Sequence, residues 1–578
     1  MKRLLALFLL ILTLALCFVG CDGGEGKLPS DVTDGEETDG GNAVVEENPM
    51  VISENGAYKY AIIYSSKAVD RVKELSKDIL DSVAELGGTV KMGTDWAKEK
   101  QDTSEDTEIL IGDTSRPESI EVLNSIGADD YAIRYIRNKI IIAAHTEERL
   151  VEAVEFFKTN LLKAGEEEGK KIVYCAGEVS FVGNSELLFT AENPLESYRI
   201  IYSRSSVLSL ETARSFADEI EQKYGVKLEV LSDRTEAAGN EIVIGMTDRE
   251  ISKKNLTEEN RSNYMVKAEG KNLLIGGYDP LVTQLAVKDV IVNDVRGYGT
   301  SLNFKADYEK SVPVFVDKAE LAEGADIRVF SFNVLFNTRL KNPTPLDRSG
   351  CLVNIMTYFE PDVIGLQEMN NSWHSAYGEA VPDNYKMLNS KTDTGVINYT
   401  TIAYNTDKVK VIDHGVKTFS KGNHTSLRVA SWGCFEKLDG GKRFILVNTH
   451  WGADEEDGMM VQAREMAELV NELKAKYGCP VLTTGDYNKK ESTPEYKEYV
   501  AVGNLHNSKY TAVLKGNVGN TYHGYEPLGT LPSTGSAECI DHIFGTSDAE
   551  FLYFTVLLDQ LALDASDHCP IFPDIKLK

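Results

Sequence analysis

The stretch VLTTGDYN, residues 481–488, decides how the second half of this sequence is read. It begins with an apolar and threonine-rich run typical of a buried β-strand, and it ends with a glycine, a carboxylate and a carboxamide. Residues i and i+2 of an extended segment point to the same side, about 7 Å apart along the backbone. We therefore expect Gly485 to let the chain turn at a sheet edge, where Asp486 and Asn488 face one ligand.

Five other strand-like runs carry polar residues at an end. They are DIRVFSFNVLF (326–336), FEPDVIGLQEMNN (359–371), RFILVNTHWG (443–452), ECIDHIFGT (538–546) and SDHCPIFPDIKL (566–577). Between them, residues 459–476 have the apolar spacing of an amphipathic helix. Because sheet packing brings strand ends together at one rim, we expect the polar residues to form one site: Asn333, Glu368, His450, Asp486, Asn488, Asp541, Asp567 and His568.

The residue types of this set indicate a chemistry. Oxygen ligands without cysteine suit Mg²⁺, with Mn²⁺ and Ca²⁺ as alternatives. Histidines beside carboxylates suit proton transfer and the stabilisation of negative charge. Each residue taken alone has a structural alternative: Glu368 as a solvated strand end, His450 as a core histidine, Asp541 as a turn cap. Together they favour metal-assisted hydrolysis at phosphorus.

The order N…QE…TH…GDxN…DH…SDH over residues 321–578 resembles the endonuclease/exonuclease/phosphatase superfamily. The resemblance implies a four-layer α/β-sandwich of the DNase-like type, with its site at one rim. It also implies that Glu368 is the principal metal ligand, with Asp567 and Asn333 completing the metal site. Asn333 is expected to support Glu368 and to contact the phosphate as well.

The resemblance assigns the reacting groups as well. His450 and Asn488 are expected to contact phosphate oxygens, and Asp486 is expected to orient or deprotonate the attacking water. Asp541 is expected to fix the imidazole of His568, which stabilises the pentacovalent state.

Two further stretches resemble motifs of some members only. TSLRVASW (425–432) places Arg428 toward the substrate, and NTYHGY (520–525) does so for His523, although either residue could be structural. Some members also carry a second acid two residues after the first Asn. This chain has Leu335 there, which favours one dominant metal site over two.

The region before the sandwich contains an internal repeat. EILIGDTSRPES (108–119) matches EIVIGMTDREIS (241–252), and YAIRYIRNKIIIAAHT (131–146) matches YMVKAEGKNLLIGGYD (264–279), both at an offset of 133 residues. We expect an α+β multidomain chain with two tandem α/β modules, residues 51–184 and 185–320, before the catalytic domain of 321–578. The phrase IGDTSRPES resembles small modules of carbohydrate-active enzymes, which leaves glycan contact and a spacer role both open.

Residues 1–21 have the basic start and short apolar core of a secretory signal. FVGC (18–21) resembles the lipobox of bacterial lipoproteins, which implies cleavage before Cys21 and a lipid on it; a plain secreted protein is the alternative. Residues 22–50, rich in Gly, Asp and Glu, are expected to form a flexible tether. The expected location is therefore extracytoplasmic, lipid-anchored to a bacterial cell membrane.

The composition narrows the choice of partner. The net charge of −29 repels polyanions, so a nucleic-acid substrate is disfavoured. Six cysteines remain after position 21, without C-x-x-C spacing, and they read as structural thiols rather than zinc ligands. We expect a metal-dependent phosphohydrolase acting on a small or lipid-derived phosphoester. The alternatives are an extracellular nuclease and a glycan-binding surface protein whose last domain is inactive.

Overall fold

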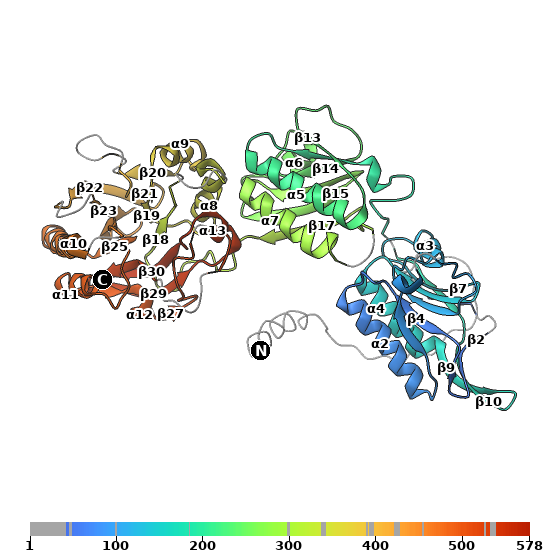
Figure 1. The fold of residues 1–578 in the computed structure, drawn as a ribbon. Helices are drawn as coiled ribbons and strands as arrows, with labels where there is room; N and C mark the ends of the chain where they lie inside the picture. The colour runs from blue at the N-terminus through green and yellow to red at the C-terminus, as the bar shows by residue number, and fades with distance from the viewer. Residues whose placement is uncertain are drawn as a thin grey trace. The chain divides into compact units, whose positions relative to one another are not determined.

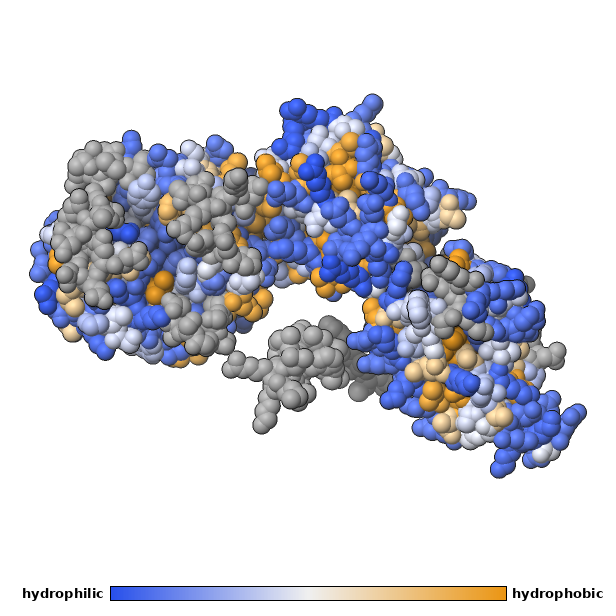
Figure 2. All heavy atoms as spheres, viewed as in Figure 1, coloured by the Kyte–Doolittle hydropathy of each residue, from blue (hydrophilic) through white to orange (hydrophobic). Residues whose placement is uncertain are grey.

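A computed structural model describes residues 42–45, 49–98, 101–183, 185–297, 301–336, 343–388, 391, 398–420, 428–453, 456–524, 528–531 and 539–578. Cys21, the signal segment and most of the predicted tether lie outside these residues. No helix in the described ranges has the length and apolar composition that crossing a bilayer requires. Hydrophilic residues predominate on the described surface in the view of Figure 2, as the charged composition predicts.

Two sheets form the C-terminal sandwich (Figure 1). The first has the order β20 (Tyr385–Leu388), β21 (Ile402–Asn405), β19 (Val363–Gln367), β18 (Ile327–Asn333), β30 (Ile571–Leu577), β29 (Ala549–Val556) and β27 (Leu514–Lys515). The second has the order β22 (Val409–Thr418), β23 (Val429–Lys437), β24 (Arg443–His450), β25 (Val481–Asp486), β28 (Asp541–Gly545) and β26 (His506–Asn507).

Helices cover the outer face of each sheet, which gives four layers. On the first sheet lie α8 (Pro345–Tyr358), α9 (Asn371–Ala380) and α13 (Gln560–Ala565); on the second lie α10 (Glu456–Tyr477) and α11 (Pro494–Val502), while α12 (Ser508–Thr511) is a short turn near β28 and β29. Strand alternation produces the layers, because successive side chains point to opposite faces. On β18, Val329 packs between the sheets, whereas Phe330 and Phe332 pack toward the helices.

The strand directions bring the polar ends to one rim. Strands β18 and β19 are parallel and pair Asn333 with Gln367, just before Glu368. Strands β24 and β25 are also parallel and pair His450 with Asp486. Strand β28 runs antiparallel to β25 and starts there with Asp541. The predicted strands and the helix expected at 459–476 are therefore confirmed, with small shifts at their ends.

Below this rim the two sheets meet at a glycine. A Cβ atom on Gly365 of β19 would lie 2.0 Å from Thr484 Oγ1 and 2.6 Å from Asn448 Oδ1, so no side chain fits there. Asn448 of β24 donates through Nδ2 to the carbonyls of Leu366 (2.8 Å) and Thr401 (2.9 Å) in the opposite sheet. Its Oδ1 accepts from Gln367 Nε2 (2.8 Å) and from Thr484 (3.1 Å). One buried carboxamide thus sets the relative position of the two sheets.

Two mixed sheets precede the sandwich. The first has the order β1 (Asn42–Val45), β11 (Glu178–Phe181), β7 (Tyr131–Ile136), β8 (Lys139–Ala144), β6 (Glu108–Ile111), β4 (Ala61–Tyr64) and β5 (Lys91–Thr94). The second has the order β13 (Glu229–Ser232), β12 (Arg199–Tyr202), β14 (Glu241–Ile244), β16 (Asn272–Gly277), β15 (Asn263–Glu269) and β17 (Glu309–Pro313).

The helices of these regions follow equivalent strands. They are α2 (Asp70–Glu85), α3 (Pro117–Leu123) and α4 (Glu147–Phe156) in the first, and α5 (Val207–Tyr224), α6 (Glu250–Asn255) and α7 (Pro280–Val290) in the second. The first region adds a four-stranded sheet, β3 (Ala57–Tyr58), β2 (Met50–Glu54), β10 (Lys170–Cys175) and β9 (Leu162–Glu167).

Equivalent buried ion pairs occur in the two regions. Arg116 pairs with Glu108 at 3.1 Å, and Arg249 pairs with Glu241 at 2.6 Å. Each arginine precedes a short helix, α3 or α6, and holds a carboxylate at the start of a central strand.

The last part of the segment predicted as a flexible tether, residues 22–50, contains strand residues. Strand β1 pairs antiparallel with β11, and β2 begins at Met50, although residues 22–50 were all expected to be flexible.

Replacing Gly365 by alanine tests the close approach of the sheets. The added methyl group meets Thr484 and Asn448, and overpacking of this kind costs about 1–3 kcal/mol. Gly378→Ala is the matched control: this glycine lies inside α9 with no atom within 4 Å of an added Cβ, so the change should stabilise by about 0.5–1 kcal/mol. Urea unfolding curves of both variants measure the difference. Equal stability of the two would contradict the proposed steric contact.

Candidate active site

Asn333 joins two carboxylates at the rim. It is fully buried at the end of β18, and its Nδ2 donates to Glu368 Oε1 (3.3 Å) and to Asp486 Oδ2 (3.1 Å). Its Oδ1 accepts the backbone N–H of Leu335 (3.1 Å). Asn333 therefore presents its amide nitrogen, and not its oxygen, to the carboxylates. This geometry suits the predicted support of Glu368 better than the predicted role as a metal ligand.

Glu368 follows β19 in a left-handed backbone conformation, with a φ of 65°. This conformation is costly for a non-glycine residue and occurs mainly where surrounding contacts enforce it. The backbone N–H of Phe336 donates to Glu368 Oε2 at 2.7 Å. Burial raises the pKa of Glu368, whereas the Phe336 N–H and the charge on His568 act to lower it. Both oxygens keep lone pairs beyond these hydrogen bonds.

Asp486 is the buried centre of the set. It is 2 % exposed and ends β25, and its Oδ2 lies 3.4 Å from Nε2 of His450 and 3.6 Å from Nε2 of His568. Burial raises the pKa of the Asp486 carboxyl. Burial also lowers the pKa of His450 to about 4, which outweighs the opposing effect of Asp486 and leaves His450 neutral at neutral pH.

Asp541 and His568 form the tightest ionic contact of the rim. Asp541 Oδ2 lies 2.8 Å from Nδ1 of His568, and both residues are buried. Burial works against the charged ring, but Asp541, Asp486 and Asp567 together raise the pKa of His568 well above its usual value. The imidazolium therefore donates to Asp541 through Nδ1 and turns Nε2 toward Asp486.

The backbone at Asn488 differs from the extended conformation that the sequence predicted. Its φ is 50°, so residues 486–488 are not extended, and its backbone N–H donates to Asp486 Oδ1 at 2.8 Å. Its Nδ2 donates to the carbonyl of Trp451 at 2.9 Å. The turn thus lies at Asn488 and not at Gly485. Gly485 instead lies within β25. A Cβ at this position would lie 2.5 Å from the carbonyl oxygen of Thr449 on β24, which is why the position needs a glycine.

The segment 520–524 pairs with the segment that contains Asp567 and His568. The backbone N–H of His523 donates to the carbonyl of Asp567 at 2.9 Å, and the ring of Tyr522 packs 5.0 Å from that of His568. Neither ring nitrogen of His523 has a hydrogen-bond partner within the described ranges. Burial lowers the pKa of His523, against the effect of Asp567. His523 therefore lies beside the site, with both ring nitrogens buried.

Arg428 precedes β23 and is partly buried. Its charge adds to burial in lowering the pKa of His450, so the guanidinium acts on the same rim. The structure thus brings all the predicted site residues to one end of the sandwich. Their individual roles stay predictions.

The donor set at this rim fits a hard divalent cation. Glu368, Asp486, Asp541 and Asp567 meet at this rim beside the imidazolium of His568. Carboxylate oxygens with spare lone pairs are the ligands that Mg²⁺ prefers. Glu368 and Asp567 are the residues that would hold it.

A second group of possible ligands lies nearby but is engaged. Glu491, Cys539 and His542 bring their ligand atoms within 4.8 Å of one another. However, Nε2 of His542 contacts the carbonyl of Lys489 (3.0 Å), Nδ1 contacts Asn507 Nδ2 (3.2 Å), and Lys509 pairs with Glu491 at 3.1 Å. These contacts occupy the ring and the carboxylate, and we assign them a structural role.

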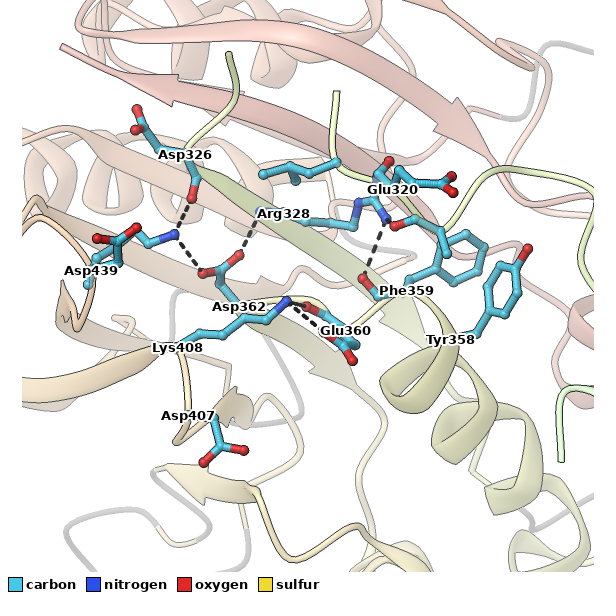
Figure 3. A pocket seen from close by; sticks show the side chains of 13 residues that line it. Glu320, Asp326, Arg328, Tyr358, Phe359, Glu360, Asp362, Asp407, Lys408 and Asp439 are labelled. Atoms are coloured by element: carbon cyan, nitrogen blue, oxygen red, sulfur yellow. Dashed lines mark hydrogen bonds and ion pairs between the residues drawn. The ribbon is translucent and has the colours of Figure 1, made fainter. Parts of the chain in front are cut away.

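A pocket of about 500 Å³ lies at the other end of β18 (Figure 3). Several of its charged groups are paired within the protein: Arg328 with Asp574 at 2.6 Å, and Lys408 with Glu360 at 3.3 Å. Lys437 lies 3.6 Å from the buried carboxylate of Asp362. None of the predicted site residues lines this pocket.

Sequence reasoning missed several residues that support the site. Ser566 Oγ donates to the carbonyl of Asn333 (2.6 Å) and accepts the N–H of His568 (3.2 Å). Thr521 Oγ1 accepts the N–H of Asp541 at 3.1 Å. Asn448 stands two residues before His450 in a strand, and this spacing was the only signal available for it.

A comparison with known protein families finds a match for this part of the chain. Residues 330–568 match the Endonuclease/Exonuclease/phosphatase family. The match takes in the rim residues and most of the sandwich and ends before β30, while the two preceding sheets lie outside it. Family members act on phosphoesters and generally depend on divalent metal ions. No curated protein matches the chain in sequence.

Solved structures of the same family resemble the domain at low sequence identity. A mannosyl-6-phosphatase of Bacteroides thetaiotaomicron is 23 % identical, covers 43 % of this chain and 99 % of its own, and gives a TM-score of 0.39. The catalytic domain of human Nocturnin is 16 % identical over 44 % of this chain and 94 % of its own, with a TM-score of 0.32. TDP2 of Caenorhabditis elegans is 20 % identical over 43 % and 96 %, with a TM-score of 0.33.

The buried His542 predicts a pH dependence of stability. Burial lowers its pKa from 6.5 to about 4, so between these pH values the unfolded chain binds a proton that the folded chain does not. The folded state is therefore destabilised as the pH falls from 6.5 toward 4. The loss in the free energy of unfolding is about 2 kcal/mol at pH 5. Urea unfolding at pH 7 and pH 5 should show a smaller acid loss for His542→Gln by that amount. The same loss in both proteins would refute this assignment.

Proposed function

We propose that the C-terminal domain is a divalent-metal-dependent phosphohydrolase that cleaves a small or lipid-derived phosphoester by attack of water. The observation that carries this proposal is the convergence of Glu368, Asn333, Asp486 and the Asp541–His568 pair at one rim, inside the family match. An inactive scaffold has no physical need to keep four carboxylates and an imidazolium so close together.

Asp486 is proposed to orient and deprotonate the attacking water. Its burial favours the protonated form, which makes the carboxylate a stronger base than an exposed aspartate. Nδ2 of Asn333 donates to its Oδ2, and the backbone N–H of Asn488 donates to its Oδ1, which fixes the carboxylate in place. The carboxylate can therefore take a proton from water without moving.

His568 is proposed to stabilise the negative charge that develops on the phosphoryl oxygens. Asp541 holds Nδ1, which keeps the ring charged and aims Nε2 at the reacting atoms. Such preorganised donors stabilise a transition state because they need not reorient during the reaction. Glu368 and Asp567 would hold Mg²⁺, which when bound would supply positive charge beside the phosphate oxygens.

Four residues at the edge of the rim are proposed to bind the substrate. Neutral His450 and the second N–H of Asn488 Nδ2 can donate to phosphate oxygens. Arg428 adds a positive charge, and His523 offers ring nitrogens that have no hydrogen bond to the described residues.

Surface tethering is proposed as the setting of this reaction. It is supported by the lipobox-like FVGC at residues 18–21 and by the polar composition that follows it. Replacement of Cys21 by alanine should move the protein from the membrane fraction to the soluble fraction of the producing bacterium. Retention of the variant in the membrane fraction would refute the lipid anchor.

We also infer that residues 51–184 and 185–320 are copies of one module. The shared offset of 133 residues supports this inference, as do the equivalent strand orders and the two matching Arg–Glu pairs. Glycan contact and a spacer role are both compatible with it, and glycan-array binding by the full chain separates them.

The decisive test is a panel of phosphoesters that includes DNA, RNA, sphingomyelin, inositol phosphates and sugar phosphates. We expect turnover that EDTA abolishes and Mg²⁺ restores. Asp486→Ala and His568→Ala should each lower kcat by about 10²–10⁴-fold, the usual contribution of an acid–base group. Asp362→Asn is the matched control, since Asp362 is equally buried but lies in the other pocket. A folded protein that binds metal yet turns over none of the panel would support the inactive, glycan-binding alternative.

Salt dependence separates a small substrate from nucleic acid. A nuclease that neutralises six to ten phosphates loses about 10³–10⁵ in affinity between 50 and 200 mM salt. The acidic chain is expected to act on compact phosphoesters, whose kcat/KM should fall by less than about 5-fold over this range, in line with few phosphate contacts. Measurement of kcat/KM at both salt concentrations decides it. A steep loss, with DNA or RNA as the preferred substrate, would favour the nuclease.

A further inference from the structure

A buried arginine stands directly behind the rim and has no catalytic assignment. Arg348 lies on α8 and is completely buried, yet no carboxylate of the described residues lies within ion-pair distance of it. Its guanidinium instead donates to backbone carbonyls: Val334 at 2.5 Å, Ala565 at 3.1 Å and Leu335 at 2.8 Å. It also stacks over the ring of Trp373 at 4.9 Å.

The three carbonyls belong to the two segments that carry site residues. Val334 and Leu335 follow Asn333, and Ala565 precedes the Ser566–Asp567–His568 run. Desolvation lowers the pKa of Arg348 to about 10, so the group stays charged at neutral pH. A buried charge without an ion pair is expensive, and its retention calls for a function other than stability.

One peptide unit links this arginine to Glu368. The carbonyl of Leu335 accepts from Arg348 and also from Nε1 of Trp373 at 2.9 Å. The N–H of the same peptide, that of Phe336, donates to Glu368 Oε2 at 2.7 Å. In a planar trans peptide the C=O and N–H point in opposite directions. Fixing the carbonyl toward α8 and α9 therefore aims the N–H at the carboxylate.

The backbone conformation indicates that this orientation is enforced. Leu335 has a φ of 56°, and Glu368 has a φ of 65°. Left-handed conformations of this kind cost about 1–3 kcal/mol each for residues other than glycine, and they persist only where surrounding contacts demand them. Hydrogen bonds in series also polarise one another, so a cation on the carbonyl strengthens the N–H as a donor.

We propose that Arg348 is a positioning residue that orients the carboxylate of Glu368 through the Leu335–Phe336 peptide. Trp373 shares this task as the second donor to the Leu335 carbonyl. The inference deepens the proposed function, because it concerns the carboxylate that we expect to bind the metal.

A second buried arginine among the described residues of the domain provides a control. Arg328 is 2 % exposed and donates to the carbonyl of Ala319 (2.7 Å), but it pairs with Asp574 and lines the second pocket (Figure 3). It stands near the start of β18, whereas Asn333 ends this strand. Substitution of Arg328 therefore reports the cost of losing a buried guanidinium without any connection to Glu368.

The test compares Arg348→Met, Arg348→Lys, Trp373→Phe and Arg328→Lys in the full chain. Amide hydrogen exchange at Phe336 reads the hydrogen bond to Glu368 directly. Titration with Mn²⁺ alone, followed by electron paramagnetic resonance, reads the carboxylate as a ligand. Circular dichroism and thermal unfolding establish which variants are folded.

We expect Arg348→Met to speed exchange at Phe336 by at least about 10-fold and to raise the Kd for Mn²⁺ by a similar factor, the loss of one charge-assisted hydrogen bond. Arg348→Lys should recover part of both, because it retains the charge but not the three-carbonyl geometry. Trp373→Phe should give a smaller change of the same kind and covers the case in which Arg348→Met does not fold. Arg328→Lys should leave both readouts unchanged.

Unchanged exchange at Phe336 in the folded Arg348 and Trp373 variants would overturn the inference, as would an equal change in Arg328→Lys. A wild-type chain that binds no Mn²⁺ would count against the proposed function. The exchange measurement would still decide the role of Arg348 in that case, since it needs no metal.

Discussion

The geometry of the candidate site depends on the contact between the two sheets at Gly365. Only a residue without a side chain lets β19 approach Asn448 and Thr484 closely enough for their hydrogen bonds to form. All four hydrogen bonds of the Asn448 carboxamide are made there. Three join it to groups of the opposite sheet, and the fourth joins it to Thr484 in its own sheet. Since Glu368, His450 and Asp486 each stand within three residues of this contact, their distances from one another are inherited from it.

A second level of control is exerted by the backbone. Peptide groups bind the carboxylates of Glu368 and Asp486, and side chains such as Ser566 bind the backbone of neighbouring segments. Peptide groups have no rotamers, so they hold a charged side chain at a lower entropic cost than another flexible side chain does. The three left-handed residues of the rim, Leu335, Glu368 and Asn488, are the conformational cost of this arrangement.

Much of the sandwich could be predicted from the sequence because its strands are short apolar runs with polar ends. The polar ends of these runs contain the rim residues, because the parallel pairs β18–β19 and β24–β25 finish at the same edge. The local geometry was not accessible in the same way. The predicted extended face at 486–488 is a left-handed turn, because the Asp486 carboxylate captures the Asn488 N–H instead of a ladder partner.

Residues that act through tertiary contact left no such signal. Arg348 lies in an ordinary helix, and its proposed positioning role depends on carbonyls of other segments, those of Val334 and Ala565. Gly485 looked like a turn residue, whereas its missing side chain makes room for the Thr449 carbonyl on the neighbouring strand. In each case the deciding interaction joins elements whose spacing along the chain carries no information about their distance.

Strand β30 follows every other strand of the sandwich in the sequence, yet it lies between β18 and β29 inside the first sheet. Without β30, strands β20, β21, β19 and β18 are separated from β29 and β27, and the residues just before β30 include Asp567 and His568. During synthesis, therefore, the nascent chain cannot close this sheet or assemble the rim until residues up to about 577 have left the ribosome. The order of strands along the chain therefore delays assembly of the candidate site until the last strand of the domain has been translated.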